Sequence, residues 1–383
     1  PAAVGARAAG PPAAPEPTSF LVQIVHLMSH ALSDGPAPSG ALESVMTLEQ
    51  FILDRRGRFP QSTGAFSRLL RDVSVAAKII NHNIRRAGIL DVMGESGTVN
   101  VQDEKQKKLD EIADRELERA LRRGGECCLV GSEEQADTIS LSPRGDFQER
   151  FAVFFDPLDG SSNTDVNASV GTIFSVYTLP EGADEGDALD VALRPGAEQV
   201  AAGYVAYGSS TMFVFTTGNG VNGFTLDPGI GEFLLTHPDL QIPQAPAMYS
   251  INEADIEDFS PELRAFLQWL KTKDPDTGHR IRARYIGSFV SDFHRNLLTG
   301  GLYMYPATSD HPDGKLRLMY EANPMAFLVE QAGGRASTGH QRILDLQPEG
   351  LHERTPLFIG SAPLVKAAEA YLQGRGAEAV GGA

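Results

Sequence analysis

The chain has 383 residues, of which 42% are hydrophobic and 22% charged, as expected for a soluble globular protein with one large domain or two closely packed ones. Its 50 Asp and Glu residues outnumber 33 Lys and Arg, which gives a formal net charge of -17. Because such a surface repels phosphate backbones, we do not expect nucleic acid as a partner. A phosphorylated ligand would need local cations, either basic side chains or bound metal.

The cysteines and the most apolar early segment bear on location. Cys127 and Cys128 are adjacent, a spacing unsuited to an ordinary structural disulfide, which favours a reducing cytoplasm. The segment 20–28 is interrupted by Gln23 and His26 and is shorter than the ~20 residues that a membrane-spanning helix needs. We therefore expect a cytoplasmic protein without membrane insertion.

Residues 1–45 are rich in Ala, Pro, Gly and Ser, and they lack the patterns of a secretion signal or an organelle transit peptide. They predict a disordered extension. Thr47, followed three residues later by Gln50, predicts a capping box that opens an amphipathic helix. The folded protein is therefore predicted to begin near Met46.

Hydrophobic periodicity predicts the elements that follow. In the first half, helices are predicted at 67–87, with Gly88 as the stop, and at 107–121, followed by strands at 127–130, 151–155, 169–179, 200–207, 211–217 and 223–226. After Pro243, helices are predicted at 261–273, 288–298, 324–332 and 364–372, with a strand at 302–305. No internal repeat or long linker is visible, so the pattern predicts a layered α+β fold with two sheets and an extensive interface between the halves.

The densest chemical signal is Asp156-Pro-Leu-Asp159-Gly160-Ser161-Ser162, directly after a predicted buried strand. Asp, Pro and Gly also favour ordinary turns, so this segment alone is open to both readings. The preceding strand would hold two carboxylates rigidly, and the Gly-Ser-Ser segment offers amides and hydroxyls to phosphate oxygens. Together these features favour a hard cation that is shared with a phosphate.

One turn cannot supply enough oxygen ligands for Mg²⁺, which takes several carboxylates together with substrate phosphate oxygens. Further candidates are Glu133-Glu134, after the predicted strand 127–130, and Glu321, before the predicted helix 324–332. Composition alone favours a solvated charge pair for Glu133-Glu134 and an ordinary turn residue before a helix for Glu321.

Six segments in one order carry a resemblance to a known family: Ser132-Glu133-Glu134, Phe155-Asp-Pro-Leu-Asp-Gly-Ser-Ser-Asn163, Val170-Gly-Thr-Ile-Phe174, Ala201-Ala-Gly-Tyr204, Ala283-Arg-Tyr-Ile-Gly-Ser288 and Gly314-Lys-Leu-Arg-Leu-Met-Tyr-Glu321-Ala-Asn-Pro-Met-Ala-Phe327. From about Thr47 to Leu372 the chain resembles class I fructose-1,6-bisphosphatases. The inositol monophosphatase relatives share mainly the Asp-Pro-Leu-Asp-Gly core.

The resemblance implies a layered αβαβα sugar-phosphatase architecture. It implies an N-terminal α/β domain of the allosteric type over 46–240, which carries the metal-binding turn, and a C-terminal sugar-phosphate-binding domain over 241–375. Residues 376–383 are predicted to form a flexible tail.

The resemblance also implies roles for individual residues. One metal ion would be held by Asp156, Asp159 and Glu321, and a second by Glu133, Asp156 and the Leu158 carbonyl. The carboxylates that position and deprotonate the attacking water would be Asp110 and Glu134. The 1-phosphate would be held by Gly160, Ser161 and Ser162, and the sugar and its 6-phosphate by Asn252, Tyr285, Tyr305 and Lys315. Arg284 would reach that phosphate from the neighbouring subunit of a homotetramer.

The implied reaction is Mg²⁺-dependent hydrolysis of the 1-phosphate of fructose 1,6-bisphosphate, in gluconeogenesis or the Calvin cycle. Two or three Mg²⁺ ions per subunit are expected, with Mn²⁺ as an alternative; the family aspartate of the third site aligns with Glu104, with Asp103 beside it. Two other functions remain open: a sedoheptulose-1,7-bisphosphatase, alone or as a dual activity, and a catalytically silent regulator that binds phosphate. The water-activating pair argues against the silent regulator.

Three features of the sequence that differ from the family pattern, or from one of its branches, carry predictions. Where family members usually carry a tyrosine close after Asn-Glu, this chain reads Asn252-Glu253-Ala254-Asp255-Ile256, which removes one donor to the 6-phosphate. The positions that bind AMP in inhibited members read Thr63-Gly64-Ala65, Arg150-Phe151 and Thr178. The loop 179–199, which carries regulatory cysteines in the chloroplast branch, has none here.

Overall fold

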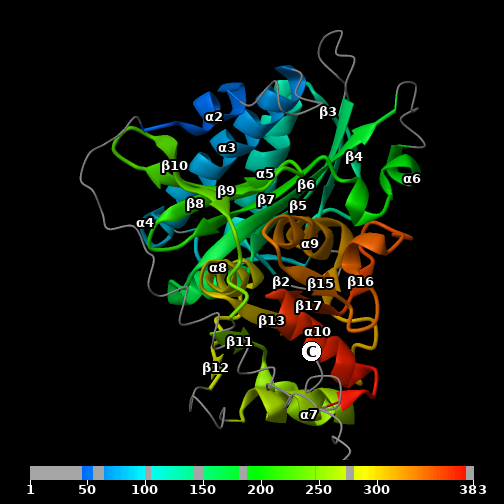
Figure 1. Ribbon diagram of the computed structural model, residues 1–383. Coiled ribbons are helices and arrows are strands. Elements are labelled where there is room, and N and C mark those ends of the chain that lie inside the picture. The colour runs from blue at the N-terminus through cyan, green and yellow to red at the C-terminus, as the bar shows by residue number, and fades with distance from the viewer. Residues whose placement is uncertain are drawn as a thin grey trace, which may run out of the picture.

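The computed structural model describes residues 45–54, 64–90, 92–99, 105–141, 150–180, 188–245, 247–272 and 280–376. The predictions for residues 1–44 and 377–383 lie outside this part of the chain, as do Thr63, Asp103 and Glu104. Figure 1 shows layers in the order helix, sheet, helix, sheet, helix, which confirms the predicted α+β architecture with two main sheets.

The first helical layer and the larger sheet are built from the N-terminal half. The helices are α2 (Leu48–Asp54), α3 (Gly64–Ile84), α4 (Ala87–Leu90) and α5 (Lys108–Gly124). The eight-stranded sheet has the order β10-β9-β8-β7-β6-β5-β3-β4. Its strands are β3 (Cys127–Ser132), β4 (Ile139–Ser140), β5 (Arg150–Asp159), β6 (Val170–Leu179), β7 (Ala201–Tyr207), β8 (Thr211–Thr216), β9 (Val221–Asp227) and β10 (Glu232–Leu240).

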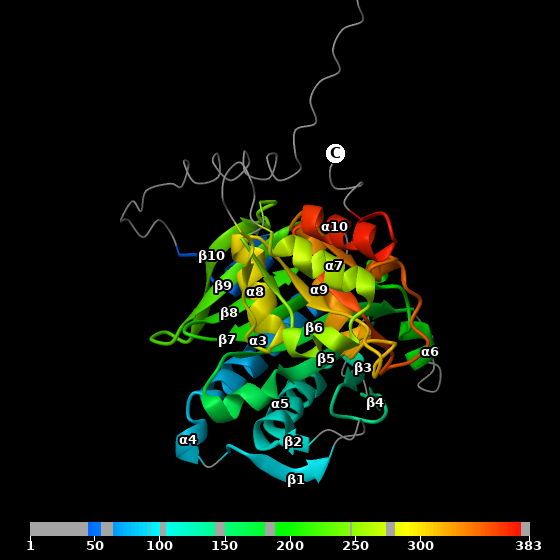
Figure 2. The ribbon, with the colours of Figure 1, turned by 90° about the horizontal axis from the view of Figure 1, so that it is seen from below.

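The C-terminal half supplies the other layers. The middle helices are α8 (Phe289–Thr299) and α9 (Asn323–Gln331), and the outer ones, side by side in Figures 1 and 2, are α7 (Pro261–Leu270) and α10 (Ala362–Leu372). The five-stranded sheet has the order β12-β11-β13-β17-β15. Its strands are β11 (Met248–Ser250), β12 (Arg282–Ala283), β13 (Gly301–Tyr305), β15 (Arg335–Ser337) and β17 (Leu357–Gly360).

Short elements complete the described chain. Two-stranded ribbons are formed by β1 (Glu95–Val99) with β2 (Lys105–Lys107), beside the start of α5 in Figure 2, and by β14 (Leu316–Arg317) with β16 (Arg354–Thr355). The remaining pieces are α6 (Ala188–Ala192), the π-helical turn η5 (Leu318–Ala322) and the 3₁₀ turns η2 (Ser161–Val166), η3 (Gly196–Glu198), η4 (Glu253–Asp258) and η6 (Ile343–Asp345).

The larger sheet is buried on both faces, because its strands alternate side chains between two cores. Ala201 and Val205 of β7 point into the core beneath α2, α3 and α5. Ala202 and Tyr204 of the same strand point into the core formed with α8 and α9. A strand covered on both sides reads as a continuous apolar run, which is why the sequence marks these strands clearly.

The ends of two helices test the sequence predictions in opposite ways. The capping box of α2 is confirmed: the Thr47 N–H donates to Gln50 Oε1 at 3.0 Å, and the Gln50 N–H donates to Thr47 Oγ1 at 3.2 Å. The predicted stop at Gly88 is wrong, because α3 ends at Ile84 and Gly88 lies within α4. Asn83 Nδ2 donates to the carbonyl oxygen of Ile79 at 2.9 Å, a side-chain bond that competes with helix continuation.

Among the described helices, none combines the length and apolar character needed to span a membrane.

Candidate functional site

Asp156 and Asp159 lie on the last residues of β5, not in a turn after it. The pairing with β6 continues to the strand end, where Asp156 faces Ile173 and Asp159 faces Gly171. Three steps along β5 therefore match two along β6, which is a β-bulge around Pro157, a residue with no N–H for the ladder. In a regular strand, side chains three residues apart point to opposite faces. The bulge brings both carboxylates to the same face.

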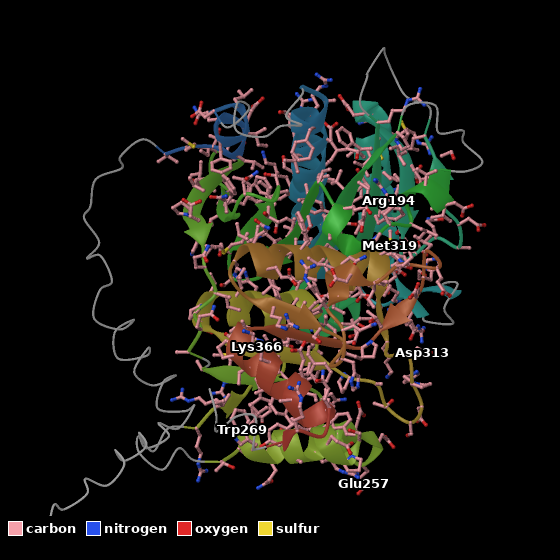
Figure 3. The ribbon with its side chains drawn as sticks, turned by 45° about the vertical axis from the view of Figure 1, so that its right-hand side comes forward. Arg194, Glu257, Trp269, Asp313, Met319 and Lys366 are labelled. Carbon is pink, nitrogen blue, oxygen red and sulfur yellow. The ribbon has the colours of Figure 1, made fainter. Side chains whose placement is uncertain are left out.

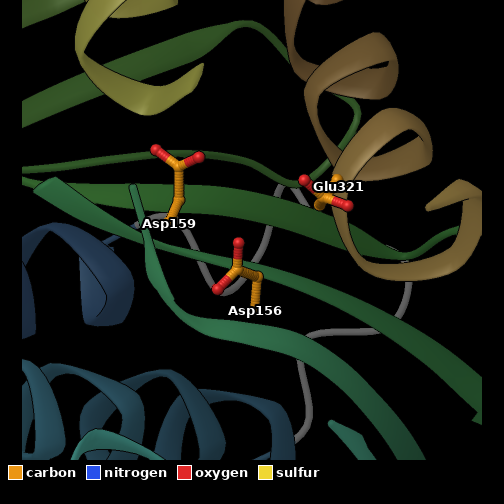
Figure 4. Close-up of side chains that lie close together, drawn as sticks. All are labelled: Asp156, Asp159 and Glu321. Atoms are coloured by element: carbon orange, nitrogen blue, oxygen red, sulfur yellow. The ribbon is translucent and has the colours of Figure 1, made fainter. Parts of the chain in front are cut away.

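Glu321 approaches these carboxylates from the C-terminal half. It lies in η5, directly before α9, and Figure 4 shows its carboxylate opposite those of Asp156 and Asp159. One oxygen from each of the three groups lies within 4.8 Å of the others. The turn is anchored by Met319, whose carbonyl oxygen accepts the hydroxyl of Ser175 on β6 at 3.1 Å and which Figure 3 places against the larger sheet.

The cluster concentrates negative charge in the interior. Asp156, Asp159 and Glu321 are 2%, 7% and 3% exposed. Burial, followed by the neighbouring carboxylates, raises the pKa of Asp156 well above its usual value, and burial likewise raises the pKa of Glu321. Burial raises the pKa of Asp159 to about 6, although three hydrogen bonds oppose the shift. They come from Ser288 Oγ at 2.6 Å and from the N–H groups of Phe289 and Val290 at 3.0 and 2.8 Å.

The donor set fits a hard divalent cation. The three clustered groups offer only carboxylate oxygens, the ligands that Mg²⁺ and Mn²⁺ prefer, and no thiol or imidazole belongs to the set. Mutual repulsion among buried carboxylates is relieved by a bound cation.

Arg317 is a cationic neighbour that the sequence analysis missed as a site residue. Its Nη1 lies 2.9 Å from Glu133 Oε1 and 3.8 Å from Glu321 Oε2, and its own backbone N–H donates to Glu321 Oε2 at 2.7 Å. It is 7% exposed and balances part of the negative charge. The sequence gives no sign of this pairing, because Glu133 arrives from β3, far away along the chain.

The carboxylates open into a cavity of about 360 Å³. Its lining brings together most of the residues implied by the resemblance: Asp110, Glu133, Glu134, Asp156, Leu158, Asp159, Gly160, Ser161, Ser162, Tyr285, Tyr305 and Glu321. Lys107, Arg317 and Phe289 are among the other lining residues.

Asp110 lies in the first turn of α5, where its carboxylate accepts the backbone N–H of Lys107 at 2.8 Å. Burial raises the pKa of Asp110 to about 7, and the charge of Glu133 adds to this, while hydrogen bonds from Lys107 and Ser161 oppose it. A carboxylate with this pKa exchanges a proton readily near neutral pH.

Gly160 is required by two features of the site. Its φ is +73°, and a Cβ at this position would lie 2.5 Å from the Cβ of Ser288. The close approach of α8 therefore depends on glycine, which turns the chain so that Ser161 and Ser162 line the cavity.

A second cavity of about 90 Å³ adjoins the first, because Tyr305 lines both. It contains Asn252 and Lys315, as implied for the sugar end, together with Asp255. Asn252 Nδ2 donates to Asp255 Oδ2 at 3.2 Å, so this cavity holds a carboxylate beside a residue implied for the sugar end. His311, which the sequence analysis did not single out, lines the same cavity and offers a donor.

Arg284 is the implied residue that the fold does not bring to either cavity. It is exposed, and its Nη1 donates to the carbonyl oxygen of Ala283 at 2.9 Å.

Comparisons with known proteins agree with this geometry. The model of "Fructose-1-6-bisphosphatase, N-terminal domain" matches residues 46–238, and that of "Fructose-1-6-bisphosphatase, C-terminal domain" matches residues 242–373. The fold and the carboxylate site thus define a phosphoric monoester hydrolase of a class that depends on divalent metal.

Similar proteins and solved structures point to one family. A class 1 fructose-1,6-bisphosphatase of Salinibacter ruber is 63% identical over 91% of this chain and 97% of its own length, and one of Cytophaga hutchinsonii is 50% identical over 87% and 96%. The crystal structure of Leishmania major fructose-1,6-bisphosphatase in holo form is 41% identical, with a TM-score of 0.79, over 86% of this chain and 99% of that one. The chain belongs to the class I fructose-1,6-bisphosphatase family.

Proposed function

We propose that the chain removes the 1-phosphate of fructose 1,6-bisphosphate in a Mg²⁺-dependent reaction, which releases fructose 6-phosphate and phosphate. The observation that carries the proposal is the buried cluster of Asp156, Asp159 and Glu321, which faces the same cavity as Asp110 and Glu134. Membership of the family supports the choice of substrate.

The carboxylates would hold two divalent ions. Asp156, Asp159 and Glu321 would bind one, while Glu133, Asp156 and the Leu158 carbonyl would bind the second. Bound Mg²⁺ supplies Lewis-acid charge that offsets the negative charge of the phosphoryl oxygens and of the leaving alkoxide. Arg317 Nη1 lies 2.9 Å from Glu133 Oε1, and this ion pair would be replaced by the contact of Glu133 with the second ion.

The chain's own groups would place the reactants. Gly160, Ser161 and Ser162 would hold the 1-phosphate through amides and hydroxyls at the end of β5. Asp110 and Glu134 would orient the attacking water in line with the scissile bond, and the raised pKa of Asp110, which reflects its burial, suits it to accept the water proton.

The two adjoining cavities would accommodate the two ends of the substrate. Asn252, Tyr285, Tyr305 and Lys315 would together hold the sugar and its 6-phosphate. Arg284, which reaches neither cavity of its own chain, would contact that phosphate from the neighbouring subunit of a homotetramer.

His311 and Asp255 provide a test of the distal pocket. Asp255→Asn should lower KM for fructose 1,6-bisphosphate, because it removes a negative charge near the phosphate, and His311→Ala should raise KM, because it removes a hydrogen-bond donor; each change should be roughly 3- to 10-fold. The kcat should stay unchanged, and Asp313→Asn, an exposed loop variant, serves as the control. An unchanged KM in both pocket variants would place the 6-phosphate elsewhere.

The reaction itself is tested by ³¹P NMR of the products at fixed Mg²⁺. We expect fructose 6-phosphate and inorganic phosphate, with slower turnover of sedoheptulose 1,7-bisphosphate in a parallel sample. Release of the 6-phosphate, or faster turnover of the larger sugar, would contradict the proposed specificity. An enzyme of this kind would act in the cytoplasm, in gluconeogenesis or the Calvin cycle.

A further inference from the structure

The turn that carries Glu133 and Glu134 is held by a residue that does not line the cavity. Asp114 lies one helical turn after Asp110 on α5 and is buried. Its Oδ1 accepts the hydroxyl of Ser132 at 2.5 Å, and its Oδ2 accepts the side-chain amide of Gln135 at 2.7 Å. The Oγ of Ser132 in turn accepts the N–H of Glu134 at 3.2 Å. One carboxylate thus fixes both ends of the turn to the helix.

A histidine holds the same turn from the other side. The Nε2 atom of His352 lies 3.0 Å from the carbonyl oxygen of Gln135 and 3.2 Å from that of Ala136. Because carbonyl oxygens only accept, Nε2 carries the proton. Nδ1 then accepts the hydroxyl of Tyr320, whose Oη lies 2.8 Å away. Tyr320 is fully buried and directly precedes Glu321.

We infer that Asp114 and His352 are positioning residues, which set the distance between the Glu133–Glu134 turn and Glu321 before metal binds. The inference rests on the proposed metal-dependent function. Carboxylates that share a buried site repel one another when no cation is bound, so the turn and η5 tend to separate. The hydrogen bonds from Asp114 through Gln135 and His352 to Tyr320 connect the two ligand-bearing segments and oppose that separation.

The most conservative substitution that tests this inference removes one oxygen atom. Tyr320→Phe keeps the ring and deletes only the hydroxyl that donates to His352. Residues that orient metal ligands typically contribute 10- to 100-fold to metal affinity, so we expect Mn²⁺ to bind roughly 10-fold or more weakly, as measured by calorimetry or electron paramagnetic resonance. The metal-free melting temperature should change little.

The chain contains a matched control. Tyr204 is also a fully buried tyrosine paired with a histidine, with its Oη 2.7 Å from His294 Nδ1, and it lines neither cavity. Tyr204→Phe should leave Mn²⁺ affinity within about twofold of the wild type, since it deletes the same kind of bond elsewhere.

Ser132→Ala tests the Asp114 side. It should also weaken Mn²⁺ binding, and combined with Tyr320→Phe it should lose less affinity than the product of the single effects, because both act on one turn. Unchanged affinity in Tyr320→Phe, or an equal loss in Tyr204→Phe, would overturn the inference alone. A wild-type chain that binds no Mn²⁺ and releases no phosphate would overturn the proposed function and the inference together.

Discussion

Replacing Asp156 by Asn removes one negative charge from the carboxylate proposed to contact both metal ions, while it preserves volume. Asp156 is 2% exposed, and its pKa is raised by burial and then by Glu133, Asp159 and Glu321. Its Oδ1 accepts the N–H of Leu158 at 3.0 Å, a bond that the amide oxygen of Asn can keep. The ionised carboxylate therefore opposes folding of the metal-free chain, and Asp156→Asn should leave that chain at least as stable.

The effect on catalysis should be large. Metal ions contribute several kcal/mol of charge stabilisation in the transition state, and a loss of about 4 kcal/mol corresponds to roughly a 10³-fold fall in kcat. In the wild type, Mg²⁺ at 100 times its Kd stabilises the folded state by about 2.7 kcal/mol. We expect the variant to lose most of this Mg²⁺-induced rise in melting temperature.

Two measurements with one control decide the matter. Initial rates of phosphate release are compared across a Mg²⁺ titration, and thermal melts are recorded with and without Mg²⁺. Asp190→Asn, an exposed substitution on α6, should behave as the wild type in both. Turnover of Asp156→Asn within tenfold of the wild type, or an intact Mg²⁺-induced stabilisation, would refute the metal assignment.

Three further outcomes follow from other parts of the chain. AMP should inhibit weakly or not at all. At positions that bind AMP in inhibited family members, Phe151 lacks a hydroxyl and Thr178 lacks a charge, and each lost polar contact costs about 1 to 3 kcal/mol. Cooperative inhibition at micromolar AMP would contradict this. Dithiol treatment of air-oxidised enzyme should not raise activity, because Cys127 is buried and burial raises the pKa of the thiols of Cys127 and Cys128. A marked rise in activity that disappears when both cysteines are replaced by Ala would contradict this. Burial raises the pKa of Asp72 to about 6, so the folded state binds the proton more tightly than the unfolded state and loses at most about 3 kcal/mol of stability as pH rises from about 4 to about 6. Asp72→Asn should therefore melt at a higher temperature than the wild type at pH 7 but not near pH 4. Equal melting temperatures at pH 7 would refute this.

Most of the helices and most strands of the larger sheet could be predicted because their patterns are local, whereas only β13 of the five-stranded sheet was predicted. Helices α3 and α5 bury one stripe of apolar residues, and β5 to β8 read as apolar runs because both of their faces are covered. Strand β10 escaped prediction, since it is an edge strand with exposed polar residues at its end, around Pro238 and Asp239. Its place in the sheet depends on pairing with β9, which local sequence does not encode.

The candidate site likewise combines features that local sequence predicts with features that depend on distant contacts. The Asp-Pro-Leu-Asp segment could be recognised as a metal-binding candidate, but the bulge that turns Asp156 and Asp159 to one face depends on the register with β6. Glu321 was one candidate among several in the sequence, and only the family resemblance assigned it to the same metal as Asp156 and Asp159, because its carboxylate meets theirs through the packing of η5 against the sheet. Arg317 was missed because Glu133 comes from a distant segment, and His311 because Asn252 and Asp255, which line the same cavity, are distant along the chain.

Phosphate release from fructose 1,6-bisphosphate by the purified full chain, with Mg²⁺ and after chelation with EDTA, tests the central claim most directly. We predict release of one phosphate per substrate molecule with Mg²⁺, its loss on chelation, and recovery when Mg²⁺ or Mn²⁺ is restored. No release with Mg²⁺, or equal release after chelation, would contradict a carboxylate-held metal centre as the catalytic site of this chain.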